Sequence, residues 1–281
     1  MEGRLWEIVL SLLPEPERDR GRFVYDVRTI LMVALWAVFN DRPQRWACHA
    51  SNWPPLLRPR WLPDPSTLCR RRRTPEVDGL LRAVQERARA LLGLPTRDAA
   101  MDSRPVVVGG ASKDRDACAG RAVGGFGKGY RAHMLVDRGG VVRVLRLQTL
   151  NVNDRRAARD LIAACPEQTK RLVADGNYDS CPLHALARAL GKRLYAPTRA
   201  NRVGRRKQRE RVWMLRLFAR KAGRRLRHAR DGIERVFAWM SNIACGLKPL
   251  PPWVRGLNRV TFWVEAKVLF YHAYRIMKTA G

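Results

Sequence analysis

The stretch from Leu172 to Ser180 constrains the fold of this chain more than any other. The residues from Arg171 to Ala174 have the composition of a short buried strand, and Asp175 stands at its carboxyl end. A Gly-Asn turn and a new helix follow, and either Asp179 or Ser180 can cap that helix. Because open α/β sheets place their chemistry at the carboxyl ends of central strands, this pattern predicts such a sheet with an acidic residue at its working edge.

From residue 98 onward, strand patterns alternate with helical ones. Strand patterns cover residues 99–102, 105–108, 130–136, 141–149, 171–175 and 193–196, and helical patterns cover 153–164 and 182–190. The turn at 137–140 joins two strands as a hairpin, so Asp137 is predicted to be a turn former and not a catalyst. The glycine-rich segment 109–129 has no periodicity and is predicted to be a loop. The predicted fold class is α/β, a mixed sheet with helical cover.

The charge balance narrows the class of partner. The chain has 55 Lys and Arg residues against 25 Asp and Glu residues, a net charge of +30 that is spread over segments with folded patterns. Such a protein needs a polyanion, for which nucleic acid is the first candidate and an acidic membrane surface the alternative. The longest apolar run, 29–39, is too short to span a bilayer, and six scattered cysteines fit reduced thiols. We therefore expect a soluble, intracellular protein.

The first 95 residues are predicted to be mainly α-helical. Apolar spacing indicates helices near 5–12, 26–40 and 75–92, with an irregular Trp- and Pro-rich loop over 46–65. A short helix begins at residues 64–67 and carries a run of four arginines, namely Arg70, Arg71, Arg72 and Arg73. This run is compatible with a helix-turn-helix that reads bases, and equally with a basic face that contacts phosphates without reading sequence.

A second basic segment lies between Arg199 and Arg235, where fifteen positions are Lys or Arg. Aromatic residues are sparse there, so contact with duplex phosphates fits better than stacking on single-stranded bases. The residues expected to make such contacts are Arg205, Arg206, Lys207, Arg224, Arg225 and Arg227.

These patterns divide the chain into three parts. We expect a helical N-terminal DNA-binding domain over residues 1–95 and an α/β catalytic domain over residues 96–246, separated by Gly93 and Pro95. Residues 247–281 are expected to form a C-terminal helix whose apolar face packs on the catalytic domain.

Three acidic residues, Asp102, Asp175 and Glu234, are candidates for the chemistry. Each has an ordinary alternative, since Asp102 fits a strand edge and Asp175 fits a helix cap. Glu234 fits a helical ion pair with Arg230, four positions earlier. Together, two aspartates at the ends of adjacent strands and one acid on a helix across the sheet can hold two divalent cations roughly 4 Å apart. Mg²⁺ in such a site bridges carboxylates and phosphate oxygens and supports in-line phosphoryl transfer.

Five segments of the chain resemble bacterial insertion-sequence transposases of the DDE type. They are 100–103, 129–133, 150–154, 174–179 and 230–237. Residues 26–28 and Trp46 with its Pro-rich loop are similar as well, so the resemblance covers most of the chain. Its most specific pieces are Asp175-x2-Tyr178-Asp179 and Arg230-x3-Glu234-Arg235.

This resemblance implies a ribonuclease H-like catalytic fold that depends on Mg²⁺ or Mn²⁺, with two ions bound. It further implies that Asp102, Asp175 and Glu234 are the metal-binding acids. In related transposases the glutamate belongs to a Tyr-x2-Arg-x3-Glu-x6-Lys signature, whose Arg and Glu match Arg230 and Glu234. The Tyr position is an arginine here, and Ser241 stands at the Lys position. The chain between the second and third acids is too short for the β-rich insertion of some relatives.

We therefore expect a transposase that cuts and joins the DNA ends of its own element at terminal inverted repeats. Arg230 is expected to orient Glu234 or to contact the scissile phosphate. Because two ends have to be brought together, the enzyme is expected to act as a homo-oligomer on double-stranded DNA, in the bacterial cytoplasm and associated with the nucleoid. Two alternatives stay open: a catalytically inactive DNA-binding derivative of such an enzyme, and a stand-alone metal-dependent endonuclease.

Overall fold

The computed structural model describes residues 2–15, 25–109, 112–198, 209–243 and 245–279. Contacts within the chain divide it into two compact units. The helical unit comprises Met1–Gly93, Asn242–Leu247 and Phe262–Gly281, and the sheet unit comprises Leu94–Ser241 and Lys248–Thr261. Within the described ranges, the helices are all too short or too polar to cross a membrane.

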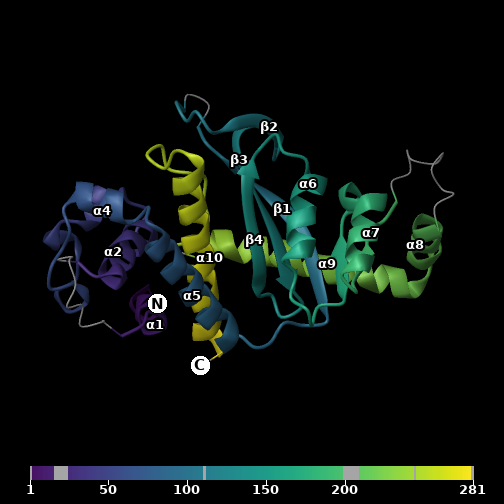
Figure 1. Cartoon of the computed structure of the whole chain (residues 1–281), viewed down its shortest axis with the longest axis horizontal. Helices are drawn as coiled ribbons and strands as arrows, with labels where there is room; N and C mark the ends of the chain where they lie inside the picture. The colour runs from purple at the N-terminus through teal and green to yellow at the C-terminus, as the bar shows by residue number, and fades with distance from the viewer. Residues whose placement is uncertain (1, 16–24, 110–111, 199–208, 244, 280–281) are drawn as a thin grey trace. The chain divides into compact units, whose positions relative to one another are not determined.

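The regular structure of the helical unit consists of helices (Figure 1). They are α1 (Glu2–Leu12), α2 (Val27–Phe39), α3 (Gln44–Ala47), α4 (Pro65–Arg71), α5 (Pro75–Leu91) and most of α10 (Leu257–Thr279), with the short 3-10 turns η1 (Ala50–Asn52) and η2 (Pro55–Leu57). Helix α2 begins where Asp26 accepts a hydrogen bond from the Thr29 N–H at 2.6 Å. Its residues from Ile30 to Phe39 are all buried, so α2 is the central helix of the unit. The predicted helices near 5–12, 26–40 and 75–92 are confirmed.

Helix α10 differs from expectation in its place in the fold. The sequence predicts the whole helix on the α/β domain, whereas its residues from Phe262 onward belong to the helical unit. Lys267 is only 1% exposed and donates hydrogen bonds to the Val38 carbonyl and the Asp41 carboxylate of that unit. An apolar periodicity identifies the buried face of a helix, but it does not identify the domain against which that face packs.

The sheet unit is built on a six-stranded sheet. Its strands are β1 (Asp98–Val107), β2 (Cys118–Ala122), β3 (Gly125–Asp137), β4 (Val142–Thr149), β5 (Arg171–Ala174) and β6 (Arg193–Tyr195). The order is β2-β3-β1-β5-β6, and β4 pairs with β3. Strand β3 runs antiparallel to β1, β2 and β4, whereas β1, β5 and β6 are parallel to one another. The predicted mixed α/β sheet is thus confirmed.

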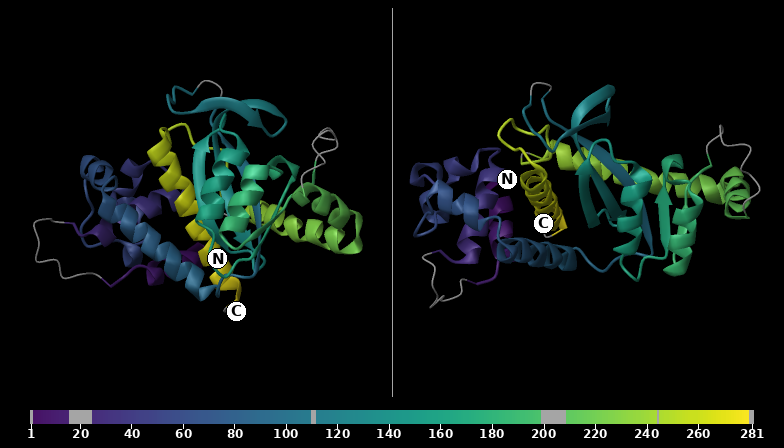
Figure 2. Two further views of the ribbon diagram at one scale, coloured as in Figure 1. Left: turned by 45° about the vertical axis from the view of Figure 1, so that its right-hand side comes forward. Right: turned by 45° about the horizontal axis from the view of Figure 1, so that its top comes forward.

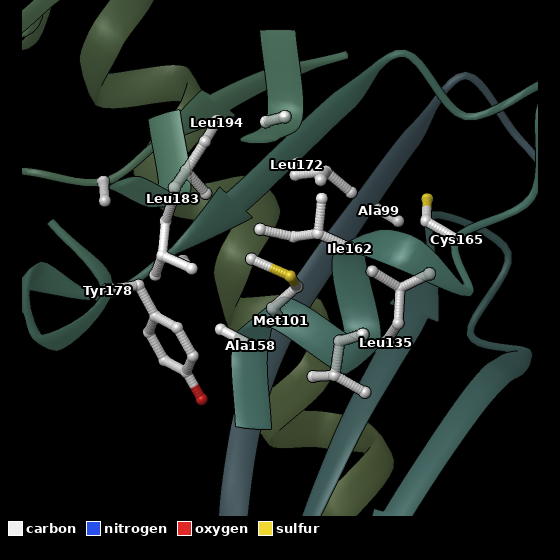
Figure 3. Packing of buried hydrophobic residues seen from close by; sticks show 14 of the residues in the cluster. Ala99, Met101, Leu135, Ala158, Ile162, Cys165, Leu172, Tyr178, Leu183 and Leu194 are labelled. Atoms are coloured by element: carbon white, nitrogen blue, oxygen red, sulfur yellow. The ribbon is translucent and has the colours of Figure 1, made fainter. Parts of the chain in front are cut away.

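One face of the sheet, called the α6 face, is covered by α6 (Asp154–Ala163) and α7 (Cys181–Ala189) (Figure 1). Met101 of β1 packs there against the apolar side of α6, and Figure 3 shows its side chain beside Ala158 and Ile162. The helix α6 starts as predicted, because Asn153 caps it by accepting a hydrogen bond from the Arg155 N–H at 2.9 Å.

The opposite face, called the α9 face, carries α8 (Arg209–Ala219) and α9 (Lys221–Asn242). Val173 of β5 packs on this side with Met214 and Phe218 of α8. Because side chains alternate along a strand, the residues that flank Met101 in β1 point to the α9 face. Asp102 is one of them, so its side chain is directed toward the helix that carries Glu234.

The segment 109–129 was predicted to be a loop, and that prediction is wrong. It contains β2 and the start of β3, which form a hairpin with the turn Val123-Gly124. Gly124 has a φ of 78°, in the left-handed region that favours glycine. Glycine recurs at every second position over residues 125–129, so no apolar and polar alternation marks this strand in the sequence.

The hairpin between β3 and β4 is fixed by Asp137, as predicted. Its carboxylate accepts hydrogen bonds from the Val141 N–H at 3.0 Å and from Arg143 Nε at 2.7 Å. The side chains of Asp137 and Arg143 are only 1% and 5% exposed. A second Asp–Arg pair, between Asp98 and Arg171 at the start of β1 and β5, is more accessible, with 18% and 39% of the side chains exposed.

These two ion pairs predict unequal effects of the same substitution. Asp137→Ala removes the carboxylate that neutralises a buried guanidinium, and is expected to lower the free energy of unfolding by about 3 kcal/mol or more. Asp98→Ala is the matched control, and its pair, which is bidentate but more exposed, is expected to contribute less, about 1 kcal/mol. Urea denaturation followed by circular dichroism measures both. Equal losses of stability would contradict the assignment of Asp137 as the internal clamp of the hairpin.

Candidate active site

The β1–β5 pairing brings Asp102 and Asp175 together. The two parallel strands pair from Asp98↔Arg171 to Met101↔Ala174, so Asp102 and Asp175 are the next positions on each strand. Met101 and Ala174 both belong to the core of the α6 face. Alternation therefore directs both aspartates to the α9 face, on neighbouring strands about 4.8 Å apart.

The electrostatics of Asp102 reflect this neighbour. Burial raises its pKa to about 6, and the charges of Asp175 and Asp154 act in the same direction. The hydrogen bond from the Ser103 N–H, at 2.8 Å, and the charge of Arg230 oppose the rise. Paired carboxylates in a partly buried site are the kind of group that divalent cations bind.

Asp175 also has a capping role at the end of β5. It caps the 3-10 turn η3 (Gly176–Tyr178), accepting hydrogen bonds from the Asn177 N–H at 2.8 Å and from Asn177 Nδ2 at 2.9 Å. Ser180 precedes α7, as predicted, but its side chain makes no capping bond. The bonds to Asn177 orient the Asp175 carboxylate and leave each oxygen a further lone pair for a cation.

Arg230 and Glu234 lie on α9, which covers the same face, and the Glu234 side chain is 55% exposed. Arg230 donates a hydrogen bond to Glu234 one helical turn later, as predicted for this spacing. Although burial alone lowers the pKa of Arg230, the bond to Glu234 and the charges of Asp102 and Asp175 outweigh it and raise that pKa. The guanidinium therefore stays charged and interacts with all three candidate acids.

The donor set fits a divalent cation but is not gathered around one point. Within the part of the chain that the structure describes, no three His, Cys, Asp or Glu side chains are close enough to hold a metal ion. The two aspartates supply paired carboxylates of the kind that Mg²⁺ and Mn²⁺ bind. The third candidate ligand, Glu234, is engaged by Arg230 instead.

Arg104 ties the helix of Glu234 to the strand of Asp102. Its Nη1 donates a hydrogen bond to the main-chain carbonyl of Phe237 in α9, at 2.6 Å. Arg104 lies two residues after Asp102 on the same face of β1, and Phe237 lies three residues after Glu234. This bond was not predicted from the sequence, although the alternation in β1 already places Arg104 beside Asp102.

A polar cluster supports β1 from the other face of the sheet. Ser103 Oγ donates a hydrogen bond to Asp154 at 3.0 Å, and Arg131 Nη1 lies 3.5 Å from the same carboxylate. His133 lies beside this carboxylate as well, and its burial holds its pKa below the ordinary value. Because Asp154 is on the α6 face, its role is to hold the strand that carries Asp102, and not to share a cation with it.

The predicted DNA-binding arginines of the helical unit do not behave alike. Arg70 and Arg73 are exposed, and Arg71 is half-buried. Arg72 is only 1% exposed, and its guanidinium lies 5.0 Å from the centre of the Phe262 ring. Four consecutive residues around one helical turn point in different directions, so one of the four arginines faces the core. The assignment of Arg72 to DNA contact is therefore corrected.

The second predicted basic set is only partly described. Arg225 is exposed on α9. Arg205, Arg206 and Lys207 lie outside the described residues, as do the side chains of Arg224 and Arg227.

A basic cavity that the sequence did not predict lies at the amino-terminal ends of β5 and β6. Its volume is about 1070 Å³, and its lining includes Lys170, Arg193 and Arg216. The Arg193 guanidinium lies 5.0 Å from the centre of the Trp213 ring of α8. The cavity is at the edge of the sheet opposite the two aspartates, since β5 starts at the cavity and ends at Asp175. Cations gathered around a hollow raise the local positive potential.

A mixed sheet of this strand order, with paired aspartates at adjacent strand ends and an Arg–Glu pair on a covering helix, defines a ribonuclease H-like domain of the DDE class. The family model described as "Transposase DDE domain" matches residues 93–271, well over half of the chain, so the protein belongs to the transposase DDE domain family. This confirms the resemblance and the fold predicted from the sequence. The family acts on DNA and generally uses divalent metal ions. No curated protein and no solved structure matched the chain.

The raised pKa of Asp102 predicts a pH-dependent effect on stability. Since its pKa of about 6 exceeds the ordinary value, the folded protein keeps a proton that the unfolded chain has lost, and stability falls as the pH rises from about 4 through 6. Asparagine carries no charge at any of these pH values, so Asp102→Asn does not lose stability in this way. The variant is expected to be the more stable protein at about pH 7.5, by on the order of 2 kcal/mol.

Thermal melts of wild type and Asp102→Asn at several pH values provide the measurement. The two melting temperatures are expected to converge near pH 4, where both side chains are neutral. Asp160→Asn, which removes an exposed charge from α6, is the matched control and should show no such convergence. A constant difference between wild type and Asp102→Asn at every pH would refute the raised pKa of Asp102, which burial and the neighbouring acids together produce.

Proposed function

We propose that this transposase binds the terminal inverted repeats of an insertion sequence and catalyses strand cleavage and strand transfer at them. The observation that carries the proposal is the register of β1 and β5, which makes Asp102 and Asp175 neighbours on the face covered by α9. The Arg230–Glu234 pair on that helix completes the set of groups that metal-dependent phosphoryl transfer requires.

Asp102, Asp175 and Glu234 would hold the metal in this mechanism. Bound Mg²⁺ or Mn²⁺, with two ions in the site, would activate an attacking water or 3′-hydroxyl and stabilise the leaving oxygen. The bonds from Asn177 orient the Asp175 carboxylate for this role, and the Ser103 N–H does the same for Asp102. Arg104 holds α9 at a fixed distance from β1, so the reach of Glu234 is set by the fold.

Arg230 would exchange partners when DNA binds. Before binding, its guanidinium neutralises the acids and holds Glu234. A scissile phosphate brings a stronger partner for the planar guanidinium, because phosphate accepts two parallel hydrogen bonds from arginine. Transfer of Arg230 to the phosphate then releases Glu234 toward the aspartates. The residue therefore both orients Glu234 and contacts the scissile phosphate, at successive stages.

The basic surfaces would hold the DNA. Exposed arginines of α4, Arg225 of α9 and the cavity beside β6 offer phosphate contacts on both units. Helix α4 contacts DNA either as part of a helix-turn-helix or as a basic face. Because two element ends must be paired, we propose that the active form on DNA is a homo-oligomer, working on DNA of the bacterial nucleoid in the cytoplasm.

The ion pair of Arg230 with Glu234 also favours a second candidate, a DNA-binding derivative without catalysis. In that protein Glu234 would stay with Arg230 and never reach a metal ion. A stand-alone nuclease differs again, because it would release cut ends without joining them.

Glu234→Gln distinguishes these candidates. The change keeps the size of the side chain and removes a metal-binding charge, so cleavage and joining of labelled element ends in Mg²⁺ are expected to fall by at least about a hundredfold. The affinity for the same DNA is expected to stay within about twofold, because few phosphate contacts change. Gel separation of nicked and joined products gives the readout, and Asp160→Asn on α6 is the charge-matched control. Equal cleavage by wild type and Glu234→Gln would sink the assignment.

The basic cavity yields a separate prediction about affinity. Arg193→Gln and Arg216→Gln are each expected to weaken duplex binding and to reduce the dependence of log K on log salt by about one unit for each phosphate that the variant no longer neutralises. Arg159→Gln, on the exposed side of α6, changes the net charge equally and is expected to leave the slope unchanged. Fluorescence anisotropy over a salt series measures the slopes. Identical slopes for all three variants would remove the cavity from the DNA path.

A further inference from the structure

The hairpin of β2 and β3 extends beyond the rest of the sheet. Strand β3 pairs with β1 only as far as Val107↔Gly129 and with β4 only as far as Tyr130↔Thr149. Residues 118–122 and 125–128 therefore form a two-stranded ribbon, visible in both views of Figure 2 as an arm that continues past β4. A two-stranded ribbon is marginally stable by itself in water, so this ribbon needs support or a partner.

The two faces of the ribbon differ in kind. One face is made of small residues, and Gly120 lies so close to the chain that a Cβ there would be 2.5 Å from the Leu150 carbonyl oxygen. The other face carries Arg121, its cross-strand partner Phe126, and Lys128. The first face packs against the protein. On the second, Arg121 and the aromatic ring are exposed, while Lys128 is half-buried and its ammonium donates a hydrogen bond to the Ser112 carbonyl at 3.1 Å.

The tip of this ribbon carries two of the most exposed apolar side chains among the described residues. Phe126 is 90% exposed, and Val123 in the turn is 88% exposed. Single exposed apolar side chains are ordinary on protein surfaces, but here two lie together at the end of a narrow arm, where one partner would cover both. Arg121 is exposed as well, so the partner meets apolar and positive groups together.

The charges around the base of the ribbon favour a polyanion. Lys113 and Arg115 are exposed in the segment that leads into β2. The two acids of that segment serve internal contacts: Asp114 accepts from the Tyr130 hydroxyl at 2.8 Å, and Asp116 accepts from the Leu257 N–H at 2.8 Å. What the ribbon offers outward is therefore positive charge with an aromatic ring, which is complementary to nucleic acid.

The exposed face of the ribbon continues the face of the sheet that carries Asp102. Asp102 pairs with Met134 of β3, and every second residue back along β3 leads to Lys128 and then Phe126. Eight residues separate Met134 from Phe126, which at about 3.3 Å per residue is roughly 26 Å. A duplex rises about 3.4 Å per base pair, so this reach equals about eight base pairs.

Arg131 connects the ribbon to the strand of the candidate active site. Its guanidinium donates a hydrogen bond to the main-chain carbonyl of Arg121 in β2. The same side chain lies 3.4 Å from Ser103 Oγ and 3.5 Å from the Asp154 carboxylate. Ser103 is the neighbour of Asp102 and donates its N–H to it. The position of the arm is thus fixed relative to the catalytic strand.

We propose that the β2–β3 ribbon is a DNA-docking arm that inserts Phe126 as a wedge into the base stack about eight base pairs from the scissile phosphate. The inference rests on the proposed function, because it assumes that the two aspartates mark the cleavage position. Arg121 and Lys128 contact the flanking phosphates, and Val123 enters the groove beside the ring. The arm distorts the duplex at one defined place and thereby fixes the register of the DNA over the acids.

The test uses the full-length protein and the DNA segments that flank its coding sequence, with 2-aminopurine placed at each position in turn and divalent metal omitted. Wild type is expected to raise the fluorescence at one step, near eight base pairs from the cut found separately in Mg²⁺. Phe126→Ala is expected to abolish that rise and to weaken binding roughly tenfold. Phe126→Trp keeps an aromatic wedge and is expected to retain the rise.

Leu94→Ala is the matched control, since Leu94 is 85% exposed in the same unit but lies outside the ribbon. An unchanged fluorescence rise with Phe126→Ala, while wild type still cuts and joins ends, would overturn the wedge and leave the proposed function intact. A shift in oligomeric state without DNA, with no change in fluorescence, would also overturn it and assign the tip to a second copy of the chain. A third outcome separates the two ideas in the other direction. If wild type shows the fluorescence rise but never cleaves DNA, and Phe126→Ala loses the rise, the arm is supported and the proposed function is refuted.

Discussion

The parallel pairing of β1 with β5 is the constraint on which the rest of the sheet unit depends. Its register ends one position before Asp102 and Asp175, so the two carboxylates become neighbours on one face. Their repulsion adds to the effect of burial on the pKa of Asp102. Positive charge from two sources compensates this concentration of negative charge. Arg230 supplies a cation from α9, and the divalent metal ions that the family generally uses are of the charge that would balance the rest.

The charge pattern of the whole chain then becomes intelligible. A net charge of +30 attracts DNA over long distances, while the acidic centre on its own would repel a phosphate. A charged arginine among the acids makes the attraction of DNA compatible with the acidic centre. Its guanidinium can face a carboxylate before binding and a phosphate afterwards. The basic cavity at the opposite edge of the sheet extends the positive surface without touching the acids.

Regular apolar spacing allowed most of the fold to be predicted from the sequence, including β5 and the helices around it. What escaped prediction lacks that signal. The β2–β3 ribbon gives no strand signal because its glycines carry no side-chain pattern. The burial of Arg72 could not be foreseen because a run of like charges does not reveal which member turns inward. Asp175 fits a cap in the sequence, but the element that it caps is a 3-10 turn of three residues, too short to leave a periodicity. The hydrogen bond of Arg104 could not be predicted, because its partner lies more than a hundred residues away in the sequence.

The Arg104 bond has a consequence for how the family can diversify. It anchors α9 directly to β1, three residues from Glu234 and two from Asp102. The polypeptide that joins Asp175 to Glu234 is therefore not the sole link between the strand of Asp102 and the helix of Glu234. Lengthening such a connection costs little free energy, since loop entropy grows only with the logarithm of length. Residues inserted in that connection would therefore leave the Arg104–Phe237 bond between β1 and α9 in place.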